Sequence, residues 1–330
     1  MRSSFIVVLA SLAAIKASAW PTIWNGLDSA IRAKGKEHVG SALTLGTDSR
    51  TEDIMKGRGE FGAMTPENAM KWESVQPSRG NFTFDDADRH AEFAVKHKKT
   101  LRCHTLVWHT LNEDGTYRET VWYKTIGEAY IPMAFRLAAK ADPKAKLWYN
   151  DYNLEFNDAK TAAAARLVKL VRSYGVRIDG VGLQGHLVGE PTPTQSNVAP
   201  SLETLERSLR QFTDLGALVE YTEVDIRLNT PATRRALQEQ SKAYQRVIGS
   251  CMAVRKCIGF TLWVKLRCLL LRNMSNSDQG VSDKYSWIPY TFEGEGAALA
   301  WDDDFKKKPA YWGILKAIKT AKWWHGHAKE

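Results

Sequence analysis

The chain has 330 residues, of which 44% are hydrophobic and 25% are charged, and these values exclude a disordered or fibrous protein. Its formal net charge is +9, but basic and acidic residues are interleaved, as where three lysines at 306–308 follow three aspartates at 302–304. This distribution favours a solvated basic surface over nucleic-acid binding.

The first nineteen residues have the pattern of a secretory signal peptide. Arg2 supplies the positive start, residues 5–15 form an apolar stretch too short to span a membrane, and Ala17-Ser18-Ala19 fits the cleavage pattern. No later segment is long and apolar enough to be a membrane span. We therefore expect a secreted protein, with residues 1–19 removed and residues 20–330 forming a single domain.

From about residue 38 onward, short apolar runs alternate with longer amphipathic ones, the pattern of βαβ units. Strands are predicted at 38–44, 60–65, 100–108, 146–150, 180–187, 218–226 and 257–263. Helices are predicted at 85–96, 119–140, 158–174, 202–215, 233–253 and 309–322. This α/β pattern predicts a parallel barrel of the (β/α)8 (TIM) type.

Seven strands are one too few, because a closed barrel of this type needs eight. Only a turn, residues 112–115, separates the strand ending at Trp108 from the helix beginning near Glu119. A whole helix-strand unit would fit at this point. The sequence therefore predicts an incomplete barrel, with one unit missing between Trp108 and Glu119.

The strand at 218–226 carries a pair of carboxylates, Glu223 and Asp225, at its C-terminal end. Its period of two predicts Tyr221, Glu223 and Asp225 on one face and Thr222, Val224 and Ile226 on the other. Since the apolar face of a barrel strand meets the helices, both carboxylates should point inward at the end where active sites lie. The alternative is a surface strand with salt-bridged acids, which the buried-strand pattern disfavours.

Other predicted strands end in polar or aromatic residues on the same rim. They are Glu67, Asn68 and Lys71 after the second strand, His104 and Trp108 on the third, Asn150 and Tyr152 at the fourth, and Gln184 and His186 on the fifth. Singly, each could be a core or loop residue, and His104 alone would favour that interpretation. Together they predict a cleft for a neutral, hydroxyl-rich ligand.

Four cysteines are present, without the spacing of a metal site. Cys251 and Cys257 bracket a short loop and could form a disulfide in an oxidising compartment. Cys103 lies in an apolar strand and is expected to be a buried thiol. Cys268 lies in a stretch that looks foreign to the rest of the chain.

Four motifs resemble those of glycoside hydrolase family 10, the retaining endo-1,4-β-xylanases. They are Thr65-Pro66-Glu67-Asn68-Ala69-Met70-Lys71-Trp72-Glu73, His104-Thr105-Leu106-Val107-Trp108-His109, Gly182-Leu183-Gln184-Gly185-His186-Leu187 and Thr222-Glu223-Val224-Asp225-Ile226-Arg227. The resemblance runs from about Gly40 to Trp312. It implies a TIM barrel that needs no metal or organic cofactor.

The resemblance also implies residue roles. Glu223 would be the nucleophile, hydrogen-bonded by His186, which Asp225 would orient. Xylose units would be held by Glu67, Asn68, Lys71, His104, Trp108 and Gln184, with Trp263 and Trp287 over the sugar beside the scissile bond. Cys251 and Cys257 match a disulfide of many fungal-type members.

The sequence departs from the family pattern first by a loss of about forty residues. The family's fourth strand ends in a Trp-Asp-Val-Val-Asn-Glu motif whose glutamate is the general acid/base, whereas here Thr110 runs directly into Leu111-Asn112-Glu113. Glu113 matches a later, loop-borne glutamate of the family pattern. The resemblance therefore implies that the general acid/base is absent from this chain.

The second departure is a gain of sixteen residues, 264–279, between Trp263 and the family's Gly-Val-Ser-Asp sequence at 280–283. A retained in-frame intron is the favoured explanation. A genuine loop insertion is the alternative, and it would carry a glycosylation sequon at Asn273, beside another possible site at Asn81.

Three hypotheses follow. The first is a secreted retaining endo-1,4-β-xylanase, a monomer that acts on xylan and binds neither nucleic acid nor a membrane. The second is a xylan-binding protein without turnover. The third is a chain that does not fold because its sequence comes from a faulty gene model with misassigned splice sites.

Overall fold

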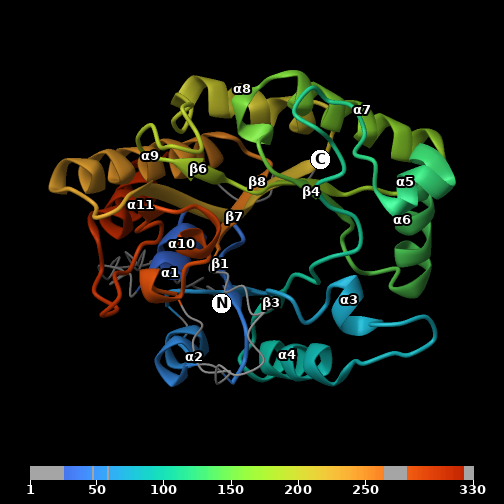
Figure 1. Cartoon of the computed structure of the whole chain (residues 1–330), viewed down its shortest axis with the longest axis horizontal. Coiled ribbons are helices and arrows are strands. Elements are labelled where there is room, and N and C mark those ends of the chain that lie inside the picture. The colour runs from blue at the N-terminus through green and yellow to red at the C-terminus, as the bar shows by residue number, and fades with distance from the viewer. Residues whose placement is uncertain (1–25, 47, 58, 264–280, 323–330) are drawn as a thin grey trace, which may run out of the picture.

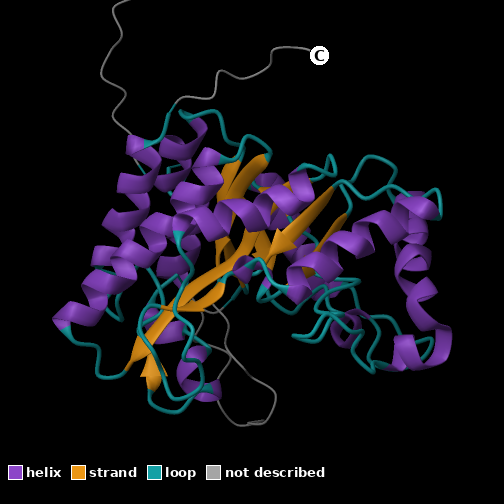
Figure 2. Cartoon of the chain, turned by 90° about the horizontal axis from the view of Figure 1, so that it is seen from above, coloured by secondary structure: helices purple, strands orange, loops and turns teal. Residues whose placement is uncertain are grey.

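The computed structural model describes residues 26–46, 48–57, 59–263 and 281–322. The signal-peptide prediction, the inserted stretch at 264–279, Asn273 and Cys268 lie outside these residues. The described residues form a sheet of mostly parallel strands surrounded by helices (Figures 1 and 2). This arrangement is an α/β barrel, as the sequence predicts.

The strands of the barrel follow one another around an interrupted ring. The main path runs β3-β2-β1-β8-β7-β5-β4, and all its pairings are parallel. Its strands are β1 His38–Leu43, β2 Ala63–Pro66, β3 Thr100–Leu101, β4 Trp148–Asp151, β5 Gly180–Leu183, β7 Leu218–Asn229 and β8 Cys257–Leu262. Within the described chain β3 and β4 do not pair, so the ring is open where the missing unit was predicted.

Two short strands and a set of helices complete the described fold. Both short strands pair with β7: β6 (His186–Val188) in parallel and β9 (Glu295–Gly296) antiparallel. The helices are α1 Leu27–Arg32, α2 Ser49–Lys56, α3 Trp72–Val75, α4 Asp85–Lys96, α5 Val121–Ile126, α6 Tyr130–Ala141, α7 Ala159–Ser173, α8 Leu202–Thr213, α9 Arg234–Ala253, α10 Ile288–Thr291 and α11 Pro309–Thr320. The single helix predicted at 119–140 was wrong, because Gly127 takes a φ of 72° and separates α5 from α6.

The third predicted strand, at 100–108, is much shorter in the structure. Only β3 pairs with β2, and the chain then leaves the sheet and crosses toward β4 (Figure 1). There Trp108 forms an isolated parallel bridge with Asn150, and the His109 N–H donates to the Asn150 carbonyl at 2.9 Å. The prediction failed because β4 has a strand edge to satisfy, and this segment supplies the partner.

Arg102 reaches across the open part of the ring. Its guanidinium forms an ion pair with Glu220 of β7, which is fully buried, and lies 4.9 Å from the Trp148 ring of β4. Glu220 also accepts hydrogen bonds from His38 and Thr261, both at 3.1 Å. One arginine beside β3 therefore contacts both the barrel interior and the opposite edge.

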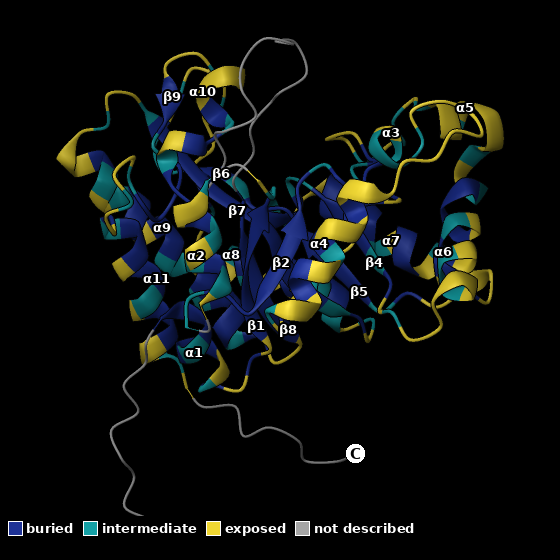
Figure 3. Ribbon diagram, turned by 90° about the horizontal axis from the view of Figure 1, so that it is seen from below, coloured by how far each residue is buried: buried dark blue, intermediate teal, exposed yellow. Residues whose placement is uncertain are grey.

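The helices that flank the opening, α4 and α6, have exposed positions, which are yellow in Figure 3. Several of the exposed residues are apolar: Val95 on α4 is 79% exposed, and Met133 and Leu137 on α6 are 47% and 66% exposed. An additional helix between α4 and α6 would cover such positions. Cys103, expected to be buried, is also exposed, because the strand prediction for 100–108 was wrong.

Cys251, near the end of α9, is joined to Cys257, the first residue of β8, by a disulfide with an S–S distance of 1.99 Å, which confirms that pairing. Since the bridge closes a loop with a sequence separation of 6, its removal should lower the free energy of unfolding by about 2 kcal/mol. Denaturant unfolding of C251A/C257A tests this. The control is C103S, which breaks no bridge, and equal losses in both variants would contradict the prediction.

Candidate active site

Glu223 and Asp225 of β7 lie at the C-terminal end of the barrel, but the strand alternation differs from the prediction. The Tyr221 hydroxyl shares a hydrogen bond with Ser250 of α9, so Tyr221 faces the helices, and Thr222 bonds Asn150 beside Glu223. The predicted faces of Tyr221 and Thr222 were therefore wrong. The pairing of β7 with β8 shifts register between Tyr221 and Val224, and such an irregularity re-aims side chains.

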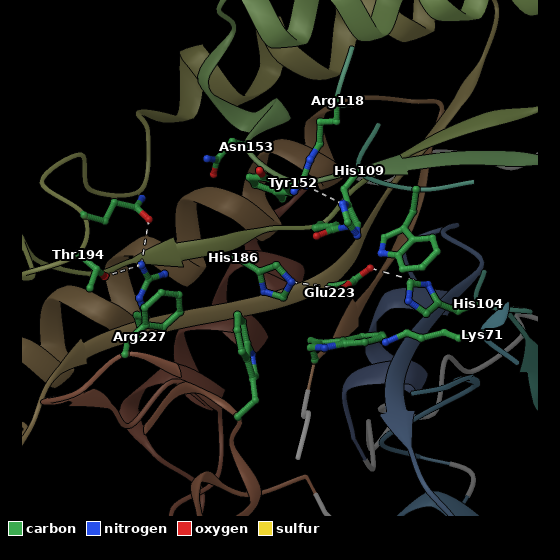
Figure 4. Close-up of a pocket in the computed structure, with 16 residues that line it drawn as sticks. Lys71, His104, His109, Arg118, Tyr152, Asn153, His186, Thr194, Glu223 and Arg227 are labelled. Carbon is green, nitrogen blue, oxygen red and sulfur yellow. Dashed lines mark hydrogen bonds and ion pairs between the residues drawn. The ribbon is translucent and has the colours of Figure 1, made fainter. Parts of the chain in front are cut away.

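Glu223 is held by three side chains, of which His186 and His104 are drawn in Figure 4. The His186 Nε2 lies 3.2 Å from its Oε2, the Asn150 Nδ2 donates to its Oε1 at 2.7 Å, and the His104 Nδ1 lies 3.9 Å from the same oxygen. The other nitrogen of His186 lies 2.9 Å from Asp225 Oδ2. A Glu223–His186–Asp225 chain therefore exists, as the resemblance implied.

This chain sets the charge of both central groups. Burial alone would raise the pKa of Glu223. The hydrogen bond from His186 and the nearby His104 lower this pKa by a larger amount, so the net pKa lies below the ordinary 4.5. Burial would lower the pKa of His186, but Asp225 and Glu223 raise it well above 6.5. An ionised glutamate next to a histidinium is therefore the stable state, and an ionised carboxylate is what a nucleophile requires.

A cavity of about 420 Å³ opens over Glu223. Of the residues predicted for the site, Lys71, His104, Trp108, Gln184, His186, Trp263 and Trp287 line it together with Glu223. The ring of Trp263 packs 5.2 Å from that of His104, and Trp287 donates from its indole nitrogen to Asp225 at 2.8 Å. The cavity thus combines flat aromatic surfaces with hydrogen-bonding groups, which suits a sugar.

Glu67 and Asn68 lie behind this lining and connect to it through Lys71. The Lys71 ammonium donates to Asn68 Oδ1 at 2.9 Å, and Asn68 donates to Glu67 Oε1 at 3.0 Å. Glu67, only 1% exposed, also accepts from Thr44. All the predicted site residues therefore gather around one cavity.

Several residues that line the cavity were not predicted from the sequence. They are His109, Arg118, Asn153, Thr194, Gln195, Arg227 and Phe292. Most come from loops after strands, where no periodicity marks a residue as inward. His109 was visible only as the last residue of a motif, and the only signal for Arg118 was its place beyond the missing unit.

Among the described residues that line this cavity, Glu223 is the only carboxylic acid. Glu113 lies elsewhere: it is exposed and bonds Lys160 and Asn153, each at 3.2 Å. Its loop position agrees with the sequence analysis. Bond cleavage that needs both a carboxylate nucleophile and a carboxylic acid therefore lacks the second group in this cavity.

Glu155 is a fully buried acid behind the site. Its Oε1 accepts from the Gly185 N–H at 2.7 Å, and burial, the largest influence, raises its pKa from 4.5 to about 7. The folded state therefore binds this proton more tightly than the unfolded state. The contribution of Glu155 to the free energy of unfolding is therefore fully present below about pH 4.5 and is lost as the pH rises toward 7.

Replacing Glu155 with glutamine should remove this pH dependence, because a neutral amide can still accept the bond from Gly185. We expect unfolding free energies measured from pH 4.5 to 7 to fall by up to about 3 kcal/mol in the parent and less in E155Q. The control is E203Q, which removes an exposed carboxylate on α8. Parallel profiles for the parent and E155Q would rule out this assignment.

Among the described residues, no group of three or more His, Cys, Asp or Glu side chains is arranged to hold a metal ion. No helix within these ranges has the length and apolar character needed to cross a membrane.

Comparison with known proteins identifies relatives over most of the chain. The profile of Glycosyl hydrolase family 10 matches residues 26–113 and, in a second segment, 110–317. "Endo-1,4-beta-xylanase 1" of Gibberella zeae is 46% identical, with 92% of this chain and 93% of that protein covered. "Endo-1,4-beta-xylanase 2" of Aureobasidium pullulans is also 46% identical, with 90% of each covered.

Solved structures show the same likeness. Penicillium canescens endo-1,4-beta-xylanase XylE has a TM-score of 0.79 at 28% identity, covering 90% of this chain and 98% of that one. A xylanase from Bispora sp. MEY-1, solved with xylobiose, has a TM-score of 0.78 at 29% identity, covering 88% and 99%. The alignment with the Gibberella zeae protein spans 347 positions although this chain has 330 residues, so that relative carries residues with no counterpart here.

Proposed function

The chain belongs to glycosyl hydrolase family 10, and from this premise we propose that it is a retaining endo-1,4-β-xylanase that uses Glu223 as nucleophile and lacks the general acid/base. The hydrogen-bonded chain from Glu223 through His186 to Asp225 supports the assignment of the nucleophile. Glu223 is the only carboxylate among the described residues that line the cavity, and this supports the absence of the general acid/base.

In the proposed reaction, Glu223 attacks the anomeric carbon of a xylose unit and forms a glycosyl-enzyme. His186 keeps the carboxylate ionised, and Asp225 holds the ring of His186 in position. Lys71, with Glu67 and Asn68 behind it, bonds sugar hydroxyl groups, as do His104 and Gln184. Trp108, Trp263 and Trp287 offer aromatic surfaces to the sugar rings.

The absent acid/base limits this reaction in a specific way. A retaining glycosidase places two carboxyl groups about 5–5.5 Å apart, and the second protonates the leaving oxygen. Losing general acid catalysis costs roughly 10²–10⁴-fold. The loss is greatest for a poor leaving group such as a sugar hydroxyl, so xylan cleavage should be slow, while cleavage of an activated aryl xyloside should persist.

Trapping the intermediate tests this proposal. Incubation with a dinitrophenyl xylobioside should add one xylobiosyl mass to Glu223, located by peptide mass spectrometry, and azide should speed turnover by attacking the adduct. E223Q should give no adduct, and E113Q, which lacks an exposed carboxylate outside the cavity, should behave like the parent. An adduct on another residue, or none in the parent, would reject the assignment of the nucleophile.

A xylan-binding protein without turnover is the second candidate, favoured by the same lone carboxylate in a lined cavity. Binding of xylohexaose by calorimetry without any adduct would support it. Sequencing the transcript across the codons for Thr110–Leu111 and 263–280 tests the third hypothesis: a message that encodes this chain in full would exclude a splicing error.

Export of this protein, its action as a monomer and the single domain at 20–330 also remain part of the proposal. Support for export comes from the pattern of residues 1–19, and the disulfide is consistent with an oxidising compartment. Sequencing the N-terminus of the secreted protein would test the cleavage site after Ala19.

A further inference from the structure

His109 lies at the place where the end of another strand would stand beside β4. Its N–H donates to the Asn150 carbonyl at 2.9 Å, and the preceding residue, Trp108, forms the parallel bridge with Asn150. Two residues later, the Leu111 N–H donates to Asp151 Oδ2 at 3.3 Å. The segment that crosses the opening is therefore tied to the C-terminal end of β4, at the rim of the barrel.

The imidazole of His109 shares the cavity with Glu223. Asn150 connects the two residues, because its carbonyl accepts from the His109 backbone while its side chain donates to Glu223 Oε1 at 2.7 Å. Figure 4 shows the His109 ring between Arg118 and Glu223. The His109 ring therefore borders the cavity in which bond cleavage would take place.

Arg118 determines which nitrogen of His109 carries the proton. Its Nη1 lies 2.8 Å from His109 Nδ1, and since a guanidinium only donates, Nδ1 must be the acceptor. The hydrogen of the neutral ring then lies on Nε2. Burial lowers the pKa of His109 to about 4, with a further contribution from the Arg118 charge, so this neutral form persists throughout the physiological range.

We propose that the Nε2–H of His109 donates a hydrogen bond to the leaving oxygen during cleavage, and that Arg118 is the positioning residue that fixes this tautomer. This inference rests on the proposed function, because it concerns the same bond cleavage at Glu223. His109 would polarise the bond from the side where a carboxylic acid is missing. It would act as a donor without transferring its proton.

The step balances without any further reactant. A Glu223 oxygen forms a bond to the anomeric carbon, and the bond from that carbon to the leaving oxygen breaks. Both electrons of the broken bond stay on the leaving oxygen, which departs as an anion accepting the His109 hydrogen bond and takes a proton from water afterwards. This path serves phenols better than sugars, because a sugar alkoxide is a much poorer leaving group.

A series of aryl xylobiosides with phenols of increasing pKa distinguishes this role from a structural one. A hydrogen bond to a developing anion is worth roughly 10–100-fold in rate. We therefore expect H109F to form the Glu223 adduct about that much more slowly than the parent with the poorest phenol, and at a similar rate with dinitrophenol. H109Q, whose amide keeps a donor, should lie between them.

A purely structural role for His109 would slow all substrates in H109F by the same factor, and that result would overturn the inference. Thermal unfolding of H109F and H109Q verifies that both variants fold, and H109Q carries the comparison if H109F does not. Failure of the proposed function gives a different result. The parent would then form no adduct even with dinitrophenol, and both proposals would fall together.

Arg118 offers an independent test through pH. R118Q keeps a donor to Nδ1 but removes the positive charge, so the pKa of His109 should rise, while burial, the larger cause, still holds it below 6.5. As the pH falls, adduct formation with a poor phenol should then begin to accelerate at a higher pH than in the parent, because the imidazolium can transfer a proton. The double variant H109F/R118Q should lose this acceleration. An unchanged pH profile in R118Q would overturn the role assigned to Arg118.

Discussion

Replacing His109 with glutamate is expected to raise the rate of cleavage of poor leaving groups, xylan included, by roughly 10²–10⁴-fold. The backbone of residue 109 is already bonded to Asn150, whose side chain bonds Glu223, so the new carboxyl group would enter the same cavity as the nucleophile. Reducing-sugar release from xylan measures the gain. Cleavage of dinitrophenyl xylobioside, which needs no acid, should change little.

Arg118 would limit this gain, because its positive charge would lower the pKa of the new carboxyl group and leave a smaller share of it protonated. H109E/R118Q should therefore exceed H109E on xylan, and R118Q alone should gain much less. H109Q provides the isosteric control without an acid. A folded H109E/R118Q that cleaves xylan no faster than H109Q would mean that residue 109 does not reach the leaving oxygen.

Replacing Arg102 with methionine is expected to lower the free energy of unfolding by about 3–5 kcal/mol, because Glu220 would then keep a buried charge without its main partner. Burial alone raises the pKa of Glu220, but Arg102 and His38 lower it more, to about 2. The contribution of Glu220 to the free energy of unfolding is thus present above pH 4.5 and is lost as the pH falls toward 2. R102M should make the free energy of unfolding depend less on pH in this range.

Denaturant unfolding of R102M measures the loss, and R177M is the matched control. Arg177 pairs with Asp179 at 3.0 Å, but its side chain is 39% exposed, so R177M should cost less than about 1 kcal/mol. The double variant R102M/E220Q should recover part of the loss, because no charge then remains buried. Similar losses for R102M and R177M would show that the ion pair does not stabilise the open ring.

Periodicity and end signals were sufficient to predict much of the fold. Helix α4 was predicted to the residue from its helical periodicity, and three aspartates in its first turn and a lysine at its end favour a helix with these bounds. The opening between β3 and β4 also followed from the sequence, since a strand count and a motif pointed to the same place. Local patterns of this kind depend only on neighbouring residues.

The remainder depended on contacts between distant segments. The strand at 100–108 stops after Leu101 because β4 offers hydrogen-bonding groups across the opening, which no local pattern reveals. The register shift in β7 likewise reversed the predicted faces of Tyr221 and Thr222. Most of the site was found through motifs, while Arg118 was missed because its contact with His109 depends on how the chain crosses the opening.

An open ring is, in its pattern of neighbours, a linear array with two ends. In a closed barrel each strand has two partners, whereas here β3 and β4 each occupy an end of the order β3-β2-β1-β8-β7-β5-β4. End units of a linear array fray first, so amide-exchange protection should rise from both ends toward β8. Glu223, on β7, belongs to the protected middle, and His109 belongs to a fraying end. The two sides of the proposed site should therefore differ in mobility, with the nucleophile held rigidly and its opposing donor exchanging between positions.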